Sequence, residues 1–208
     1  MKQIRTLLIA SLLLSLMLNT HAQKDRTLSN GFSIQLIVGI PSPEYGVSKD
    51  ATVDKEFQFS SLFGLQLGNR WYFTNSDQFG IGLMVNWFDV SSALASYEIQ
   101  QDEIIRLTVD ATFLELGPIG TYAINSDMAV DAYYNLRPTG LATIAIDENS
   151  SIEDDAYGSG FTHALGAAFR WKVLSVGIES VLGNIKDYDD SEIKLQANNF
   201  RFVIGVKF

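Results

Sequence analysis

The feature that most constrains the fold of this chain is a repeated alternation of apolar and non-apolar side chains. In the stretch GIGLMVNW, the apolar residues Ile81, Leu83 and Trp87 are separated by small or polar ones such as Gly82 and Asn86. Successive side chains of a strand point to opposite faces, so this pattern predicts strands with one apolar face. Eight such stretches occur, at residues 31–40, 57–73, 79–91, 104–124, 128–138, 159–171, 174–182 and 195–208.

The connections between these stretches alternate in length. Three are tight turns, at residues 75–77, 125–127 and 171–173, and four are long, at residues 41–56, 93–103, 139–158 and 183–194. Outer-membrane barrels join an even number of antiparallel strands by short periplasmic turns and longer external loops. The sequence therefore predicts an all-β fold, an eight-stranded antiparallel up-and-down transmembrane β-barrel.

The non-apolar face of the predicted strands is rich in glycine and in charged residues. Such residues suit a narrow barrel interior, where side chains pack closely and charges pair, and the apolar face is then expected to contact lipid. Seven charged residues are assigned to the interior: Arg70, Glu115, Arg137, Arg170, Glu179, Arg201 and Lys207. Each buried glutamate should pair with an arginine. A rigid ion-pair plug is the preferred interpretation, and a narrow ion path is the alternative.

Aromatic residues recur at the predicted strand ends beside the short turns. Aromatic girdles mark the membrane interfaces of transmembrane barrels, so these residues predict a ring at the periplasmic interface. The alternative is the general preference of aromatic residues for strands. The predicted girdle contains Trp71, Phe73, Phe79, Tyr122, Trp171 and Phe208.

The N-terminal residues have the pattern of an export signal. Lys2 and Arg5 precede an apolar run at residues 7–18, and Ala22 provides a small residue for cleavage. We predict a signal peptide at residues 1–22, a short periplasmic segment at 23–30 and an outer-membrane barrel domain at 31–208. A membrane anchor is the alternative for the first segment. The chain has 0 cysteines, so no disulfide framework contributes to its stability.

The charge balance is acidic. The whole chain has a net charge of −9, and removal of Lys2 and Arg5 leaves 13 basic against 24 acidic residues, a net charge of −11. This balance argues against a nucleic-acid partner, which needs a basic surface. The long loops contain 16 of the acids: Glu44, Asp50, Asp54, Glu56, Glu98, Asp102, Glu103, Asp147, Glu148, Glu153, Asp154, Asp155, Asp187, Asp189, Asp190 and Glu192. A solvated acidic surface is the preferred interpretation, and divalent cation binding at 153–155 or 187–192 is the alternative.

Two segments and the C-terminal strand resemble those of known membrane barrels. The segments FLELGPIGTYAI, from Phe113, and FRWKVLSVGIESVLG, from Phe169, resemble strands of the PorT-like group within the small outer-membrane β-barrel families. The last strand, NNFRFVIGVKF, resembles the C-terminal signal that the barrel-assembly machinery recognises. The resemblance covers residues 31–208 and implies an outer-membrane location, with lipid and the assembly machinery as partners. It implies little chemistry.

Some residues depart from the ideal pattern. Asn69, His163 and Ser180 fall on the predicted lipid face. Pro118 lies within a predicted strand and has no backbone N–H to donate, so we expect a bulge near Gly117 and Pro118.

No catalytic or cofactor site is predicted. His163 is the one histidine after the predicted signal, and no convincing orienting group for a catalytic triad accompanies it. The expected function is therefore a structural or surface-interaction role through the acidic loops, with the external ligand unknown. A narrow pore is the first alternative. A secreted soluble calycin-like barrel that binds an apolar ligand is the second.

Overall fold

The computed structural model describes residues 27–43, 45–46, 58–59, 61–76, 78–99, 102–146, 152–189 and 193–208. Among them, no helix is long and apolar enough to cross a membrane. The strands are β1 (Gly31–Pro41), β2 (Gln58–Phe59), β3 (Leu62–Asn75), β4 (Phe79–Ile99), β5 (Asp102–Ala123), β6 (Met128–Ile146), β7 (Ile152–Trp171), β8 (Leu174–Leu182), β9 (Asn184–Asp187), β10 (Lys194–Gln196) and β11 (Asn199–Lys207). The predicted signal peptide lies outside the described residues.

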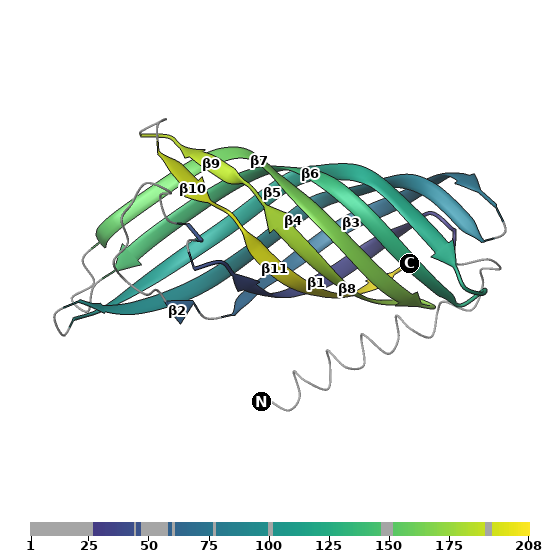
Figure 1. Cartoon of the computed structure of the whole chain (residues 1–208), viewed down its shortest axis with the longest axis horizontal. Helices are drawn as coiled ribbons and strands as arrows, with labels where there is room; N and C mark the ends of the chain where they lie inside the picture. The colour runs from purple at the N-terminus through teal and green to yellow at the C-terminus, as the bar shows by residue number, and fades with distance from the viewer. Residues whose placement is uncertain are drawn as a thin grey trace, which may run out of the picture.

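The long strands close into a barrel. From β3 to β8, each long strand pairs antiparallel with the next one in the chain, and β1 joins the two ends by pairing with both β3 and β11. Strand β11 completes the wall by pairing with β8. The described residues therefore form a closed eight-stranded antiparallel barrel, which confirms the predicted fold class. Figure 1 shows the C-terminus at one end of the barrel and the short strands β2, β9 and β10 toward the other.

Several strands are longer than the sequence predicted. The predicted loops 93–103 and 139–158 are wrong over much of their length, because β4 continues to Ile99 and β7 begins at Ile152. The clear apolar alternation fades in these segments, but a hairpin ladder needs only backbone hydrogen bonds. Residues 93–103 also contain no glycine or proline that would interrupt the ladder.

The strands near the C-terminus are interrupted. The predicted loop 183–194 contains β9 and the start of β10, and the predicted last strand at 195–208 is broken between β10 and β11. The predicted second strand is also too long, because β3 begins at Leu62 and Phe59 belongs to the separate strand β2. Gly183 has a φ of 157° at the junction of β8 and β9, where a side chain would meet Thr162. A glycine is therefore needed at this bend.

Two β-bulges lie opposite each other in the wall. On β5, Leu114 has a φ of 61° and is the extra residue between the pairs that β5 makes with β6. On β4, Trp87 is the extra residue against β3. The bulge expected near Gly117 and Pro118 is therefore wrong in position. Pro118 pairs with Leu83 and faces outward, so the ladder continues past it.

Candidate functional site: the charged interior of the barrel

The barrel is polar inside and apolar outside. The seven charged residues assigned to the interior are all buried, and their exposed fractions do not exceed 6%. Many large apolar side chains on the same strands are exposed on the outer wall, for example Leu36 at 61% and Leu165 at 64%. This arrangement is the opposite of the apolar interior that a soluble calycin-like barrel requires.

Five further charged residues are buried that were not predicted to face the interior: Asp89, Arg106, Asp110, Asp131 and Asp187. Asp187 was expected on the solvated acidic surface, and this is wrong because its side chain is buried. With the seven predicted residues, the described interior contains six cations and six carboxylates. The alternation contained the signal for Asp131, because it has the same parity as Arg137 on β6. Asp89 and Asp110 were missed because a bulge shifts the parity between Asp89 and Asn86 on β4, and another between Asp110 and Glu115 on β5.

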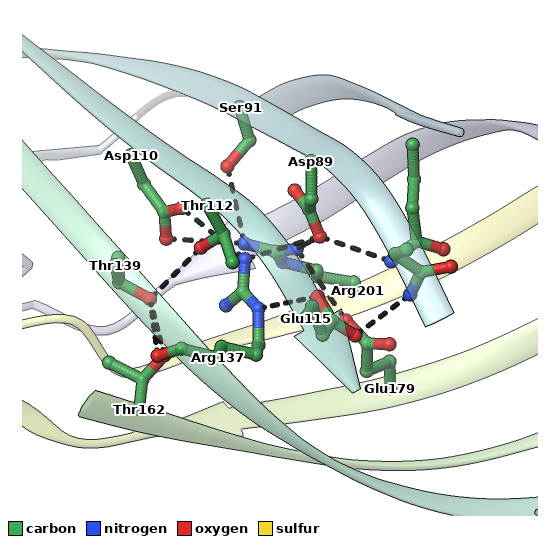
Figure 2. A network of polar contacts seen from close by, with 12 residues as sticks. Asp89, Ser91, Asp110, Thr112, Glu115, Arg137, Thr139, Thr162, Glu179 and Arg201 are labelled. Carbon is green, nitrogen blue, oxygen red and sulfur yellow. Dashed lines mark hydrogen bonds and ion pairs between the residues drawn. The ribbon is translucent and has the colours of Figure 1, made fainter. Parts of the chain in front are cut away.

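Arg137 is at the centre of the larger ion-pair network (Figure 2). Its Nε atom lies 3.0 Å from Oε2 of Glu115, and its Nη2 atom lies 3.1 Å from Oδ2 of Asp89 and 3.3 Å from Oδ1 of Asp110. All four side chains are fully buried. A single guanidinium from β6 thus connects carboxylates from β4 and β5, which fixes the three strands against one another.

Arg201 of β11 carries the same network across the barrel. Its Nη1 atom lies 2.8 Å from Oδ2 of Asp89 and 3.5 Å from Oε1 of Glu179, and its Nη2 atom lies 3.3 Å from Oδ2 of Asp110. Figure 2 shows Arg137 and Arg201 side by side among these carboxylates. Four carboxylates therefore share two guanidinium groups. The side-chain amides of Asn86 and Asn135 donate to Glu115 at 2.9 and 2.6 Å, and that of Gln66 donates to Asp89 at 3.1 Å.

The paired bulges position this network. In a regular strand, residues three apart point to opposite faces. On β4, however, Asn86 and Asp89 both point inward, because Trp87 and Phe88 both face outward. On β5, Thr112 and Glu115 likewise both point inward across the outward-facing pair that includes Leu114. The bulges thus orient Asp89 and Glu115 toward the interior, where both contact Arg137, and re-aiming a side chain is a recognised use of bulges.

A second network lies nearer the short turns. Asp131 accepts hydrogen bonds from Arg70 at 2.6 Å and from Nε and Nη2 of Arg170 at 2.7 and 3.0 Å. Arg170 also donates to the carbonyl of Thr27 at 2.7 Å, and Lys207 donates to the carbonyl of Ser29. The described part of the predicted periplasmic segment therefore lies against this mouth of the barrel. The cations Arg70, Arg170 and Lys207 thus outnumber the carboxylate of Asp131, whereas carboxylates outnumber guanidinium groups in the central network.

Apolar layers separate and cap the charged layers. Tyr72, Met84, Ile119 and Tyr133 form one buried cluster inside the barrel. A second cluster at the other end includes Ile37, Leu62, Leu141 and Leu195, together with Tyr45. Burial raises the pKa of the Tyr45 phenol above its ordinary value, so this residue remains neutral. Apolar and charged side chains thus alternate along the described interior.

The predicted aromatic residues lie on the outer wall. Phe79 pairs with Tyr122, and Trp171 and Phe208 also lie at the short-turn end, as does the exposed Phe73. Trp71 lies deeper, because it pairs with Leu83 and its ring meets that of Trp87 edge-on at 6.1 Å. Four residues follow Trp71 on β3, so it lies further from the short-turn end than the other five, and its place in the girdle stays a prediction.

Two of the polar residues predicted to face lipid have partners on the outer surface. Asn69 accepts a hydrogen bond from the indole of Trp87 at 2.7 Å. His163 lies 2.6 Å from the hydroxyl of Tyr134 and stacks on its ring. Thr162, the residue before His163, points into the barrel, where its hydroxyl lies 2.8 Å from the hydroxyl of Thr139. It therefore lies on the opposite face of the strand from His163. No group of three potential metal-ligating residues occurs among the described side chains, and Asp190 and Glu192 lie outside them.

No family model and no curated protein matches the sequence. Among solved structures, the chain is similar to Ail, the attachment invasion locus protein of Yersinia pestis, with 12% identity, a TM-score of 0.40 and coverage of 86% of this chain and 97% of that one. It is also similar to the outer membrane protease OmpT from Escherichia coli, with 10% identity, a TM-score of 0.49 and coverage of 91% of this chain and 99% of that one. The transport unit of the autotransporter AIDA-I from Escherichia coli has 11% identity and a TM-score of 0.43, with coverage of 92% of this chain and 93% of that one. The likeness concerns the fold alone.

Proposed function

We propose that this chain is an integral outer-membrane β-barrel with a closed lumen, whose role is structural or surface-interactive. The observation that carries the proposal is the reversed polarity of the wall: the charges are inside and the large apolar side chains are outside. Only a helix or a closed barrel satisfies every backbone hydrogen bond within lipid. The exposed aromatic residues near the short turns suit one membrane interface.

The longest strands support a surface role. Strand β5 contains 22 residues, and at about 3.3 Å per residue its extended length is more than twice the 25 Å height of a typical apolar belt. Strands β4, β6 and β7 are of similar length. The hairpins they form extend away from the short-turn end (Figure 1). We infer that these extensions and their acidic residues form the surface that meets an external partner.

Single-channel conductance in planar bilayers tests the closed lumen. The protein should first be shown to be folded by a heat-dependent shift in gel mobility. A closed lumen predicts a folded barrel that produces no discrete openings, because the ion pairs and apolar layers obstruct the path of ions. Steady openings from the folded barrel would contradict the proposal of a closed lumen.

A narrow pore is the second candidate function, and a specific observation favours it. Within the central network, the side-chain oxygens of Gln66, Asn86 and Asn135 lack a hydrogen-bond partner among the described residues. Buried polar atoms of this kind usually bind water. A chain of water along the charged layers would give ions a path, and in that case substitution of Arg137 should change the ion selectivity of the openings.

A further inference from the structure

An apolar groove lies on the outer wall of the barrel, over strands β5, β6 and β7. It has a volume of about 620 Å³, and its floor is a row of small residues that pair directly across the strands. Ala111 of β5 pairs with Gly140 of β6, and Gly140 pairs with Ser159 of β7. A groove on a lipid-facing wall is continuous with the surface that lipid chains already cover.

The groove has a wall on each side, formed by the neighbouring rows of side chains. Phe113, Pro138 and Phe161 form the wall nearer the short turns, and Pro138 pairs with Phe161. Tyr157 and Tyr188 form part of the other wall, with ring centroids 5.6 Å apart. The shape is a channel that runs across the strands between aromatic side chains, which is suited to a flexible hydrocarbon chain.

The row of small residues on the floor of the groove ends beside two lysines. Ser159 pairs with Lys186 of β9, and Lys186 pairs with Lys194 of β10. Both lysines are exposed and lie directly opposite each other in the ladder. Like charges directly opposite each other in a sheet are destabilising, so this pair favours a bound anion. Asp189 on the same hairpin is already an acceptor for the hydroxyl of Tyr157, at 3.3 Å.

We propose that the groove and the two lysines bind one membrane lipid, with an acyl chain along the groove and a phosphate headgroup at Lys186 and Lys194. The proposal rests on the proposed function, because it requires the outer wall to contact lipid. The hydroxyl of Tyr188, which donates to Ser159 at 2.7 Å, lies where the apolar channel gives way to the charged end. An apolar groove with two cations at one end matches a lipid that has an acyl chain and an anionic headgroup.

Native mass spectrometry of the folded full chain, released from bilayers that contain equal amounts of palmitoyl-oleoyl phosphatidylglycerol and palmitoyl-oleoyl phosphatidylcholine, tests the proposal. These two lipids share their chains and differ in headgroup charge. We expect the protein to retain phosphatidylglycerol preferentially. The double substitution K186Q and K194Q should reduce this retention by about tenfold, since each lysine contributes to anionic lipid binding.

The groove is tested separately by Gly140→Leu, because a Cβ at this position would meet no atom closer than 3.8 Å and the leucine side chain would extend into the groove. This variant should lose both lipids. The matched controls are Gly120→Leu, where the nearest atom is also 3.8 Å away, and Lys172→Gln at a short turn, and neither should change retention.

Equal retention of both lipids, or retention by Gly140→Leu at the level of the unsubstituted protein, would overturn the proposal. Displacement of the lipid by inorganic phosphate at equal concentration would also overturn it, because recognition would then need no acyl chain. Failure of the proposed function looks different: the chain would not insert into the bilayer or show a heat-dependent shift in mobility.

Discussion

At the scale of single residues, the interior depends on charges that have no access to bulk water. Arg137 contacts three carboxylates within 3.3 Å, and it is fully buried. Loss of one member of a buried ion network is costly because its partners remain as uncompensated buried charges. The network therefore makes each arginine important for stability, whether or not the barrel conducts.

The substitution Arg137→Met tests this dependence. It keeps much of the side-chain volume and removes the charge, so we expect the free energy of unfolding to fall by about 3–5 kcal/mol. Urea unfolding in lipid vesicles, followed by tryptophan fluorescence, would measure the change. The matched control Lys172→Met removes the same charge from an exposed turn and should leave stability unchanged. A loss below about 1 kcal/mol for Arg137→Met would mean that the network is not a stabilising element.

At the scale of strands, the paired bulges at Trp87 and Leu114 set which side chains enter the barrel. Leu114 adopts a φ of 61°, a conformation that costs a non-glycine residue about 1–2 kcal/mol. The extra residue on β5 lets Thr112 and Glu115 point to the same side. Without it, the segment before the bulge would present its other face to the interior.

Two variants of Leu114 separate the bulge from its side chain. Leu114→Gly keeps the extra residue and relieves the left-handed backbone, so stability should change by no more than about 1 kcal/mol. Deletion of Leu114 removes the bulge, and we expect the barrel to lose its heat-dependent shift in gel mobility. A deletion variant that folds like the unsubstituted protein would show that the bulge does not set the register.

The bulges also explain what the sequence could and could not predict. Regular alternation was sufficient to predict eight wall strands and the inward placement of residues such as Arg70 and Arg201. A single extra residue has no periodic signal of its own, so the bulge was misplaced at Pro118. Strand ends were missed for a related reason: hairpin ladders continue where the apolar pattern stops, as they do to Ile99 of β4.

At the scale of the whole molecule, the interior charges are balanced in number but separated along the barrel. The central network has more carboxylates than guanidinium groups, whereas the network near the short turns has more cations. The sequence predicted the kind of residue inside, but not this separation, because it depends on the height of each strand in the closed wall. The outer groove was likewise not predictable, since its floor joins residues from three strands.

The central claim is that the apolar outer wall faces lipid, and the three tryptophans provide its most direct test. Quenching of their fluorescence by lipids brominated at different depths should be measured in variants that each retain one tryptophan. Trp171, at a strand end, should be quenched most by bromines near the headgroups, and Trp71 and Trp87 by deeper bromines. Fluorescence that no brominated lipid quenches, from protein that is folded, would contradict the membrane-spanning barrel.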